Sequence, residues 1–410
     1  MVATQGAVDF EEKLRLARAI GLRARDRRRQ HDDDASFPEE TFAEVRAAGL
    51  HTMGVPVEHG GLGLWQRDSY VPYYKILEAL AEGDSSVSQM VQITTHATGI
   101  VAALGSDQQR AYYMPKVVDD GALMSSVGSE AHFKDKGLEV YKSELKRGSD
   151  GKLHLSTRKA FASLAPAAAF WVLWVAVEGE GDFADRLTFV CVPNGTPGAR
   201  LVDDWDTLGM RSTISQSIEI NDLVVPEEWV VGAPGDWMVK DPRTFTLAYT
   251  ANHLGTAQGA VNFAIDYIRE REHLQKDEVT MTAIGDMQCQ LFTVRQALYA
   301  VAEEWERGED YDLAELNSMR VLHSAKQVAL YVTSRLFDLL GARATSRTYP
   351  LEQMLRDVRT FTLHFRDDAY MRIVASADLG KPFVAKGSRS GSSPGQGRAH
   401  LHIGNLDAVG

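Results

Sequence analysis

The chain has 410 residues, of which 44% are hydrophobic and 24% are charged, and its formal net charge is −12 at pH 7. This length and apolar content suffice for two or three domains with buried cores, while the acidic balance argues against binding along a nucleic-acid backbone. The two cysteines, Cys191 and Cys289, lie far apart in the sequence. They argue against a disulfide framework or a thiolate metal site, and they agree with a reducing cytoplasm.

Helical spacing of apolar residues predicts an N-terminal helical domain over residues 1–122. Ser36 and Glu39 have the spacing of a capping box at a helix start. His96 lies among small and apolar residues, where a lone histidine is more often a core residue than a catalyst. The helices predicted here span residues 8–33, about 65–82, about 85–104 and 107–118, and another begins at Ser36 and runs through Leu50.

Residues 123–232 predict a central β domain, because β-branched and aromatic runs alternate there with turn residues. Within it, the segment 155–177 begins as an alternating strand, reaches Ser163 and continues as an apolar run. The run is shorter than the roughly 20 residues of a membrane helix and contains Pro166. We therefore predict a buried strand pair with a turn, in which Ser163 faces either a cofactor or the core.

Helical spacing returns over residues 233–385 and predicts a C-terminal helical bundle. Residues 386–410 are rich in glycine and serine, which predicts a flexible tail. The common nucleotide-binding and hydrolase motifs are absent. The helices predicted for the bundle span residues 243–270, 281–307, 310–341 and 350–379.

Three motifs together resemble the acyl-CoA dehydrogenase superfamily, over about residues 8–385. Gly341, followed by the sequence YPLEQMLRDVR over 349–359, is similar to the family's glycine turn and P-[LV]-E-x-x-x-R-D motif. The sequence LGMRST over 208–213 resembles its G-M-R-x-T turn, and AFAS over 160–163 its flavin-facing strand. The resemblance implies a mainly α fold with an N-terminal helical domain, a β-barrel-like middle domain and a C-terminal four-helix bundle.

The chain departs from the dehydrogenases of this family at the catalytic base. Those enzymes remove a proton with a glutamate, and the two positions that the resemblance gives for it hold Phe365 and, near the start of the bundle, Phe245 or Thr246. None of these side chains is a carboxylate that can accept a proton. A dehydrogenase or oxidase is the alternative function, and it requires a displaced base from the set Glu130, Asp367 and Asp368.

The two-component flavin monooxygenase branch of this fold lacks the same glutamate, and in this respect the chain resembles it. The branch includes dibenzothiophene monooxygenase, the oxygenase of 4-hydroxyphenylacetate hydroxylase and amino-sugar nitrososynthases. The resemblance implies Ser163 beside flavin N5, with His96 and His364 near the face that reacts with oxygen. It implies that a separate reductase supplies reduced flavin, which forms a C4a-hydroperoxide with molecular oxygen. The distal oxygen is then transferred to nitrogen, sulfur or carbon of a small organic substrate.

The same resemblance assigns the cofactor contacts. Phe161 is expected against the isoalloxazine and Ser129 at its pyrimidine edge, while Arg271 and Gly341 belong to the cofactor-binding set. Arg271 resembles an arginine that meets a flavin phosphate of a neighbouring subunit in a homotetramer. The family's phenylalanine-glycine pair does not follow Arg271, so both FMN and FAD remain candidate cofactors. Trp205 is placed at the substrate cavity, although a tryptophan there is more often packing. A third interpretation is a degenerate member that binds flavin or a partner without turnover.

Overall fold

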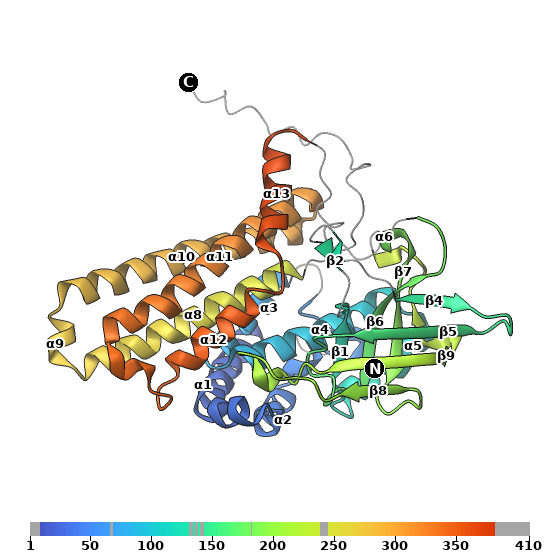
Figure 1. Cartoon of the computed structure of the whole chain (residues 1–410), viewed down its shortest axis with the longest axis horizontal. Helices are drawn as coiled ribbons and strands as arrows, with labels where there is room; N and C mark the ends of the chain where they lie inside the picture. The colour runs from blue at the N-terminus through green and yellow to red at the C-terminus, as the bar shows by residue number, and fades with distance from the viewer. Residues whose placement is uncertain are drawn as a thin grey trace, which may run out of the picture.

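A computed structural model describes residues 9–65, 69–130, 134–135, 138–139, 143–181, 183–237 and 245–381. Figure 1 shows the long C-terminal helices on the left, the sheet on the right and the N-terminal helices packed between and below them. The predicted order of helices, central β region and helical bundle is confirmed. The exact domain boundaries stay predictions, and the tail over 386–410 lies outside the described residues.

The N-terminal helices begin and end mostly where local signals predict. In α4 the Asp84 carboxylate accepts the backbone N–H groups of Ser86 and Val87, at 2.8 and 3.2 Å. The predicted capping box at Ser36 is wrong, because Pro38 precedes α2 and the Ser36 hydroxyl bonds the ring of His31 instead. These elements are α1 (Phe10–Asp34), α2 (Glu39–Ala47), η1 (Leu50–Thr52), η2 (Val57–His59), α3 (Tyr70–Ala81), α4 (Ser85–Leu104) and α5 (Asp107–Val118).

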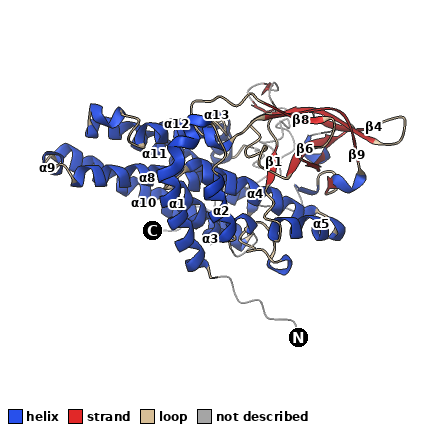
Figure 2. Ribbon diagram, turned by 90° about the horizontal axis from the view of Figure 1, so that it is seen from below, coloured by secondary structure: helices blue, strands red, loops and turns tan. Residues whose placement is uncertain are grey.

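The central sheet has the strand order β10-β7-β6-β4-β5-β9-β8, with β1 paired in parallel to β6. Helices cover one side of it, as Figure 2 shows. The elements here are β1 (Met124–Val127), the small pair β2 (Lys134–Asp135) and β3 (Leu138–Glu139), β4 (Glu144–Arg147), β5 (Leu153–Lys159), β6 (Phe170–Val177), α6 (Phe183–Arg186), β7 (Leu187–Pro193), β8 (Ala199–Val202), η3 (Arg211–Thr213), β9 (Ser217–Val225), η4 (Glu227–Trp229) and β10 (Val230–Val231).

The predicted strand pair over 155–177 is wrong in its pairing. The two strands exist as β5 and β6, but β4 lies between them and β5 pairs on its other side with β9. The connection between them cannot act as a hairpin turn, because its amides bond to the segment around η3. Ala162 N–H donates to Gln216 O at 3.3 Å and Leu164 N–H to Thr213 O at 2.8 Å.

The C-terminal bundle consists of α8 (Thr246–Arg269), α9 (Glu272–Gln275), α10 (Glu278–Arg307), α11 (Tyr311–Leu340), η5 (Ala342–Thr345), α12 (Leu351–Phe361) and α13 (Asp367–Asp378). The single helix predicted over 350–379 is wrong, since it is divided into α12 and α13. Lys326 on α11 donates to Phe365 O at 2.9 Å and to Asp367 at 2.5 Å. A continuous helix would place the Phe365 carbonyl and the Asp367 side chain elsewhere, so these two bonds hold the break. His364 therefore lies in a break between helices.

The R-D motif joins the bundle to the rest of the chain. Arg356 on α12 bonds the buried carboxylate of Asp32 on α1 at 2.6 Å, and Asp357 accepts the Met210 N–H at 2.6 Å. A Cβ on Gly209 would come within 2.3 Å of the Arg356 carbonyl, so only glycine permits this approach. The motif thus fixes the turn that precedes η3. None of the helices in the described part of the chain combines the length and apolar content that a membrane crossing requires.

Candidate functional site

Strained backbone surrounds Ser163. Phe161 and Leu164, on either side of it, have φ angles of 53° and 58°. Across from them, Met210 and Ile214 have φ angles of 57° and 41°. Non-glycine residues rarely adopt this region, and each costs of order 1–3 kcal/mol unless the surrounding structure holds it. Four such residues in two segments that are hydrogen-bonded to each other mark this turn as a candidate site.

Phe161 is the most unusual side chain of this turn, because its large apolar ring is 64% exposed. Its ring meets that of Trp205 edge-on, with centroids 6.1 Å apart. Trp205 is half-buried and its indole N–H donates to Arg211 O at 2.9 Å. The structure therefore brings these two predicted residues together and leaves a ring face of Phe161 open to a further planar group.

A buried lysine that the sequence reasoning missed holds the end of β5. The Lys159 side chain is 0% exposed, and its ammonium donates to Glu130 at 2.8 Å, Trp174 O at 2.6 Å and Gly128 O at 3.2 Å. All three ammonium hydrogens have acceptors. The next residue, Ala160, donates its N–H to Ser129 O at 3.0 Å, so the predicted pyrimidine-edge residue lies beside the end of β5.

His96 lies in an aromatic cluster. It is 2% exposed on α4, and its ring centroid is 4.1 Å from that of Phe245 and 4.6 Å from that of Trp65. Trp174, from the apolar strand β6, also meets Phe245 at 5.6 Å. The apolar run after Ser163 thus supplies a ring to the same cluster as His96.

His364 also lies against the start of α8. Its ring is 5.1 Å from Tyr249 and 4.6 Å from Phe361, and its Nδ1 is 3.2 Å from Phe361 O. The side chain is exposed, but the protein around it lowers the pKa of His364 because it disfavours the imidazolium. His253, which the sequence reasoning missed, also packs against Phe361 at 5.1 Å, and burial lowers its pKa well below the usual value.

The three predicted catalytic residues lie on elements that meet. Phe245 and Tyr249 are one turn apart at the start of α8, so His96 and His364 pack against neighbouring turns of one helix. Ser163 is connected to α4 through β1. Ser125 Oγ donates to Ser163 O at 2.7 Å, and the adjacent Met124 N–H donates to Thr94 Oγ at 3.0 Å.

Arg271 and Gly341 lie at the other end of the bundle. Arg271 precedes α9, which Figure 1 places far from the sheet, and its guanidinium lies 3.4 Å from the Tyr267 ring centroid. Gly341 ends α11 with φ 78°, a conformation that favours glycine. Tyr349, after that turn, packs against Tyr267 at 5.5 Å. Within one chain these two residues are therefore not brought together with Ser163.

The carboxylates that were candidates for a displaced base are all held by cations. Glu130 is 3% exposed and paired with Lys159. Asp367 bonds Lys326 at 2.5 Å. Asp368 bonds Arg366 at 2.5 Å and Arg372 at 3.0 Å, and these bonds lower its pKa to about 2. At the family's usual base position, Phe365 packs edge-on against Tyr249 at 4.7 Å.

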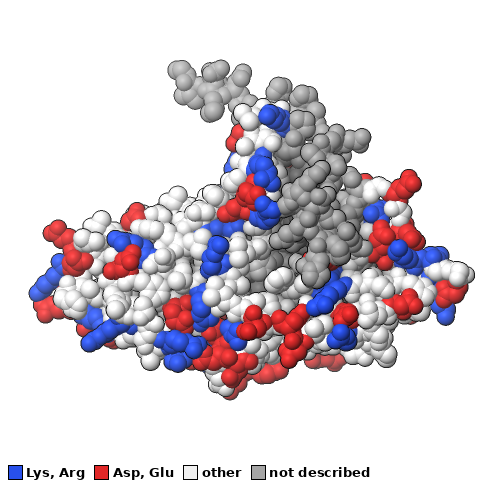
Figure 3. Space-filling view, viewed as in Figure 1, with Lys and Arg blue, Asp and Glu red and all other residues white. Residues whose placement is uncertain are grey.

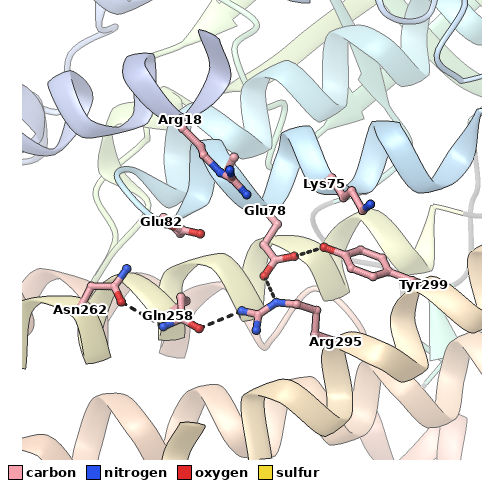
Figure 4. Close-up of a pocket in the computed structure, with 9 residues that line it drawn as sticks. Arg18, Lys75, Glu78, Glu82, Gln258, Asn262, Arg295 and Tyr299 are labelled. Atoms are coloured by element: carbon pink, nitrogen blue, oxygen red, sulfur yellow. Dashed lines mark hydrogen bonds and ion pairs between the residues drawn. The ribbon is translucent and has the colours of Figure 1, made fainter. Parts of the chain in front are cut away.

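A separate polar hollow of about 440 Å³ lies between α1, α3, α8 and α10 (Figure 4). Glu78 bonds Arg295 at 2.5 Å and Tyr299 at 2.6 Å, and Arg295 also donates to Gln258 at 2.9 Å. Burial, and then the nearby Glu78, raise the pKa of Glu82 to about 7. Most of the polar groups in this hollow are hydrogen-bonded to one another, so they connect the helices that surround it.

The surface carries both signs of charge. On the face in Figure 3, basic side chains lie among the acidic ones.

Known proteins share both the fold and the sequence pattern. The fold matches the crystal structure of FMN-bound TdsC from Paenibacillus sp. A11-2, with a TM-score of 0.79, 24% identity and coverage of 93% of this chain and 99% of that one. It also matches butyryl-CoA dehydrogenase from Megasphaera elsdenii, with a TM-score of 0.80, 20% identity and coverage of 91% and 99%. The dibenzothiophene monooxygenase of Rhodococcus erythropolis is 24% identical over 367 residues, which cover 82% of this chain and 85% of that protein.

The fold and these matches define the class of an acyl-CoA dehydrogenase-like protein. Residues 17–120 match the N-terminal domain of acyl-CoA dehydrogenases and residues 247–368 match their C-terminal domain. Together the two matches span more than half of the chain. The chain belongs to the acyl-CoA dehydrogenase family, and the predicted fold class is confirmed.

Proposed function

We propose that the protein is a reduced-flavin-dependent monooxygenase of the cytoplasm. In this proposal a separate reductase supplies reduced FMN or FAD, molecular oxygen is the co-substrate, and a flavin C4a-hydroperoxide oxygenates a small organic substrate at nitrogen, sulfur or carbon. The similarity to a dibenzothiophene monooxygenase and to FMN-bound TdsC supports this choice within the family.

The observation that carries the proposal concerns the catalytic base. Phenylalanine occupies position 365 and also position 245. The carboxylates of Glu130, Asp367 and Asp368 are each bound by a cation, and a carboxylate stabilised in its charged form is a weaker base. Dehydrogenation by proton removal from an acyl thioester therefore has no suitable group among these described residues.

In this proposal the flavin ring lies against the turn around Ser163. The open ring face of Phe161 would pack on the isoalloxazine, the Ser163 hydroxyl would bond N5 and Ser129 would meet the pyrimidine edge. Bound reduced flavin would supply the activation of oxygen. The chain would contribute the orientation of N5, and the apolar strand β6 with the rings around Phe245 would exclude water.

The two histidines would have different roles. His364 is exposed, and its lowered pKa keeps the imidazole neutral near pH 7, so it can accept one proton and donate another. His96 is enclosed by Trp65 and Phe245, which suits a histidine that acts in a dry pocket. We assign proton movement during oxygen transfer to both residues, with His364 as the more accessible of the two.

The roles of Arg271 and Gly341 require a second copy of the chain. We propose a homotetramer in which Arg271 meets a flavin phosphate of a neighbour. Its support is a pair of exposed apolar side chains on one face of α10, where Met281 and Phe292 are 53% and 61% exposed. Light scattering should report four chains, and a monomer would contradict this part of the proposal.

The experiment that tests the function mixes the protein, loaded anaerobically with reduced FMN or FAD, with oxygenated buffer in a stopped-flow spectrometer. We expect an absorbance band of the hydroperoxide that decays slowly. Ser163→Ala should shorten its lifetime and release more hydrogen peroxide, because N5 loses its partner. Ser156→Ala, which alters an exposed hydroxyl on the preceding strand β5, is the matched control.

Two outcomes would favour the rival functions. Rapid bleaching of bound oxidised flavin by acyl-CoAs, without a reductase, would establish a dehydrogenase with a displaced base. Flavin binding without any oxygen intermediate or product would indicate a member that binds flavin without turnover. Either result would refute the monooxygenase proposal.

A further inference from the structure

Two buried glutamines on α4 carry amide groups that form no hydrogen bonds within the described part of the chain. Gln89 is 1% exposed and Gln92 is 0% exposed. The side-chain oxygen and nitrogen of both residues lack a hydrogen-bond partner among the described residues. A polar group that leaves water without gaining a new partner lowers the stability of the folded state, so four such atoms on two neighbouring residues need an explanation.

A third buried glutamine shows how the fold treats a glutamine with a structural role. Gln109 on α5 is 8% exposed, and its side-chain oxygen accepts the Ser106 N–H at 2.8 Å. Its side-chain nitrogen donates to Glu228 O at 2.9 Å and to Val230 O at 2.8 Å. The amide of Gln109 is therefore used within the protein, in contrast to the two amides on α4.

The two amides lie on the face of α4 that is turned toward α8. They are three residues apart, so they are neighbours on the helix, with Ser85 four residues before the first and His96 four residues after the second. Ser85 Oγ donates to Asn252 Oδ1 on α8 at 2.7 Å. The His96 ring centroid is 4.1 Å from that of Phe245, which immediately precedes α8. Contacts with α8 thus bracket the two amides.

The facing turn of α8 has no polar side chain to offer at the corresponding level. One turn before Asn252 lies Ala248, whose methyl group forms no hydrogen bond. The helix α4 therefore presents two donor and acceptor groups, while α8 presents a small apolar residue. A bound molecule that supplies the missing donors and acceptors would explain this asymmetry.

The chemistry of the amides and of their surroundings restricts that molecule. A carboxamide both donates and accepts, so it pairs best with a donor and an acceptor that lie side by side, as in a cyclic amide. The amides carry no charge, and burial of an ion that they could not neutralise would be costly. The rings of Trp65 and Phe245 pack against His96 at one end of this face, which suits an aromatic ligand.

We propose that Gln89 and Gln92 form a recognition site for an uncharged aromatic compound that carries an N–H donor beside a carbonyl acceptor, and that this compound is the substrate. The identification of the ligand as the substrate rests on the proposed function, whereas the binding by the two amides does not. A wholly apolar aromatic compound leaves all four amide atoms without partners, so it binds more weakly.

The test measures dissociation constants of the full chain by equilibrium dialysis without added flavin. The probe is 2-quinolone, whose fused rings carry an N–H beside a carbonyl, and the control ligand is naphthalene, which has the same two-ring skeleton without either group. We expect the native chain to bind 2-quinolone roughly tenfold more tightly than naphthalene. Gln89→Leu and Gln92→Leu should each weaken 2-quinolone binding by roughly three- to tenfold, the equivalent of one hydrogen bond, without weakening naphthalene binding.

The matched control is Gln109→Leu, the same substitution at a buried glutamine whose amide is bonded. It should lower the melting temperature of the ligand-free protein and leave 2-quinolone binding unchanged. Gln89→Leu and Gln92→Leu should instead raise the melting temperature, because each removes buried polar atoms that have no partner. Far-ultraviolet circular dichroism checks that all three variants are folded.

Three results would overturn the recognition site. They are equal binding of 2-quinolone and naphthalene by the native chain, native affinity for 2-quinolone in folded Gln89→Leu and Gln92→Leu, and a fall in their melting temperatures like that of Gln109→Leu. Because the dialysis involves neither flavin nor oxygen, it is independent of the stopped-flow experiment. Selective binding of 2-quinolone without any oxygen intermediate would therefore support the site and refute the monooxygenase function.

Discussion

Replacing Lys159 with methionine should destabilise the protein strongly. The ammonium group has three acceptors and no exposed surface, and Glu130 beside it is 3% exposed. Methionine fills a similar volume but leaves the Glu130 carboxylate buried without its cation. Removal of one partner of a buried ion pair costs about 3–5 kcal/mol, which is a large part of the stability of an ordinary domain.

The measurement is the free energy of unfolding in urea, followed by tryptophan fluorescence. Trp174 is a local probe, because its carbonyl accepts a hydrogen bond from the Lys159 ammonium. Lys159→Met combined with Glu130→Gln should be less destabilised than Lys159→Met alone, since the uncompensated charge is then gone. Lys146→Met is the control. Its side chain is 56% exposed and 3.5 Å from Glu178, so we expect a change within about 0.5 kcal/mol.

Two results would refute this reasoning. A loss below about 1 kcal/mol for Lys159→Met would mean that the Glu130 carboxylate finds water or another donor, so that it is not stranded. A double variant less stable than the single variant would show that the charge of Glu130 stabilises the fold without Lys159.

Three further predictions concern charge. Because the pKa of Glu82 is raised to about 7, the folded state loses stability as pH rises from about 4.5 through 7. At pH 8, Glu82→Gln should therefore unfold at a higher temperature than the native chain. At pH 4 the two should unfold at the same temperature. Asp32→Asn should cost about 2–3 kcal/mol in urea unfolding, because Arg356 loses two charge-assisted bonds at 2.6 and 3.1 Å. The lowered pKa of His364 predicts a product yield that stays constant between about pH 6 and pH 8, and a yield that falls in that range would contradict it.

Local signals in the sequence were sufficient for many elements. The helices over 85–104 and 107–118 were predicted from their residue spacing with the limits that α4 and α5 have, and in the structure Asp84 and Ser106 cap their first turns. The motif over 349–359 was recognised from its own residues, and in the structure its Arg356 and Asp357 bind Asp32 and the Met210 N–H.

Other features depend on contacts between distant residues. The break at His364 is fixed by Lys326 on another helix. The residues of the segment 350–379 do not by themselves predict it. The hydroxyl groups of Ser163, Ser215 and Thr213 come together because the segment around Thr213 bonds the connection that holds Ser163. Lys159 has the sequence pattern of one polar residue of an alternating strand, whereas its ammonium is bound by Gly128 and Glu130 after β1 and by Trp174 of β6.

The insertion of β4 between β5 and β6 has a consequence for how the protein folds. Because β5 pairs with β4 and β9, and β6 with β1, β4 and β7, the ends of the Ser163 segment are fixed only when residues from 124 to 225 have assembled. Pairings so distant in sequence form slowly, since the loop must close before the contact compensates for its entropy. The strained turn around Ser163 should therefore be acquired late, and a fragment ending before β9 should contain no site.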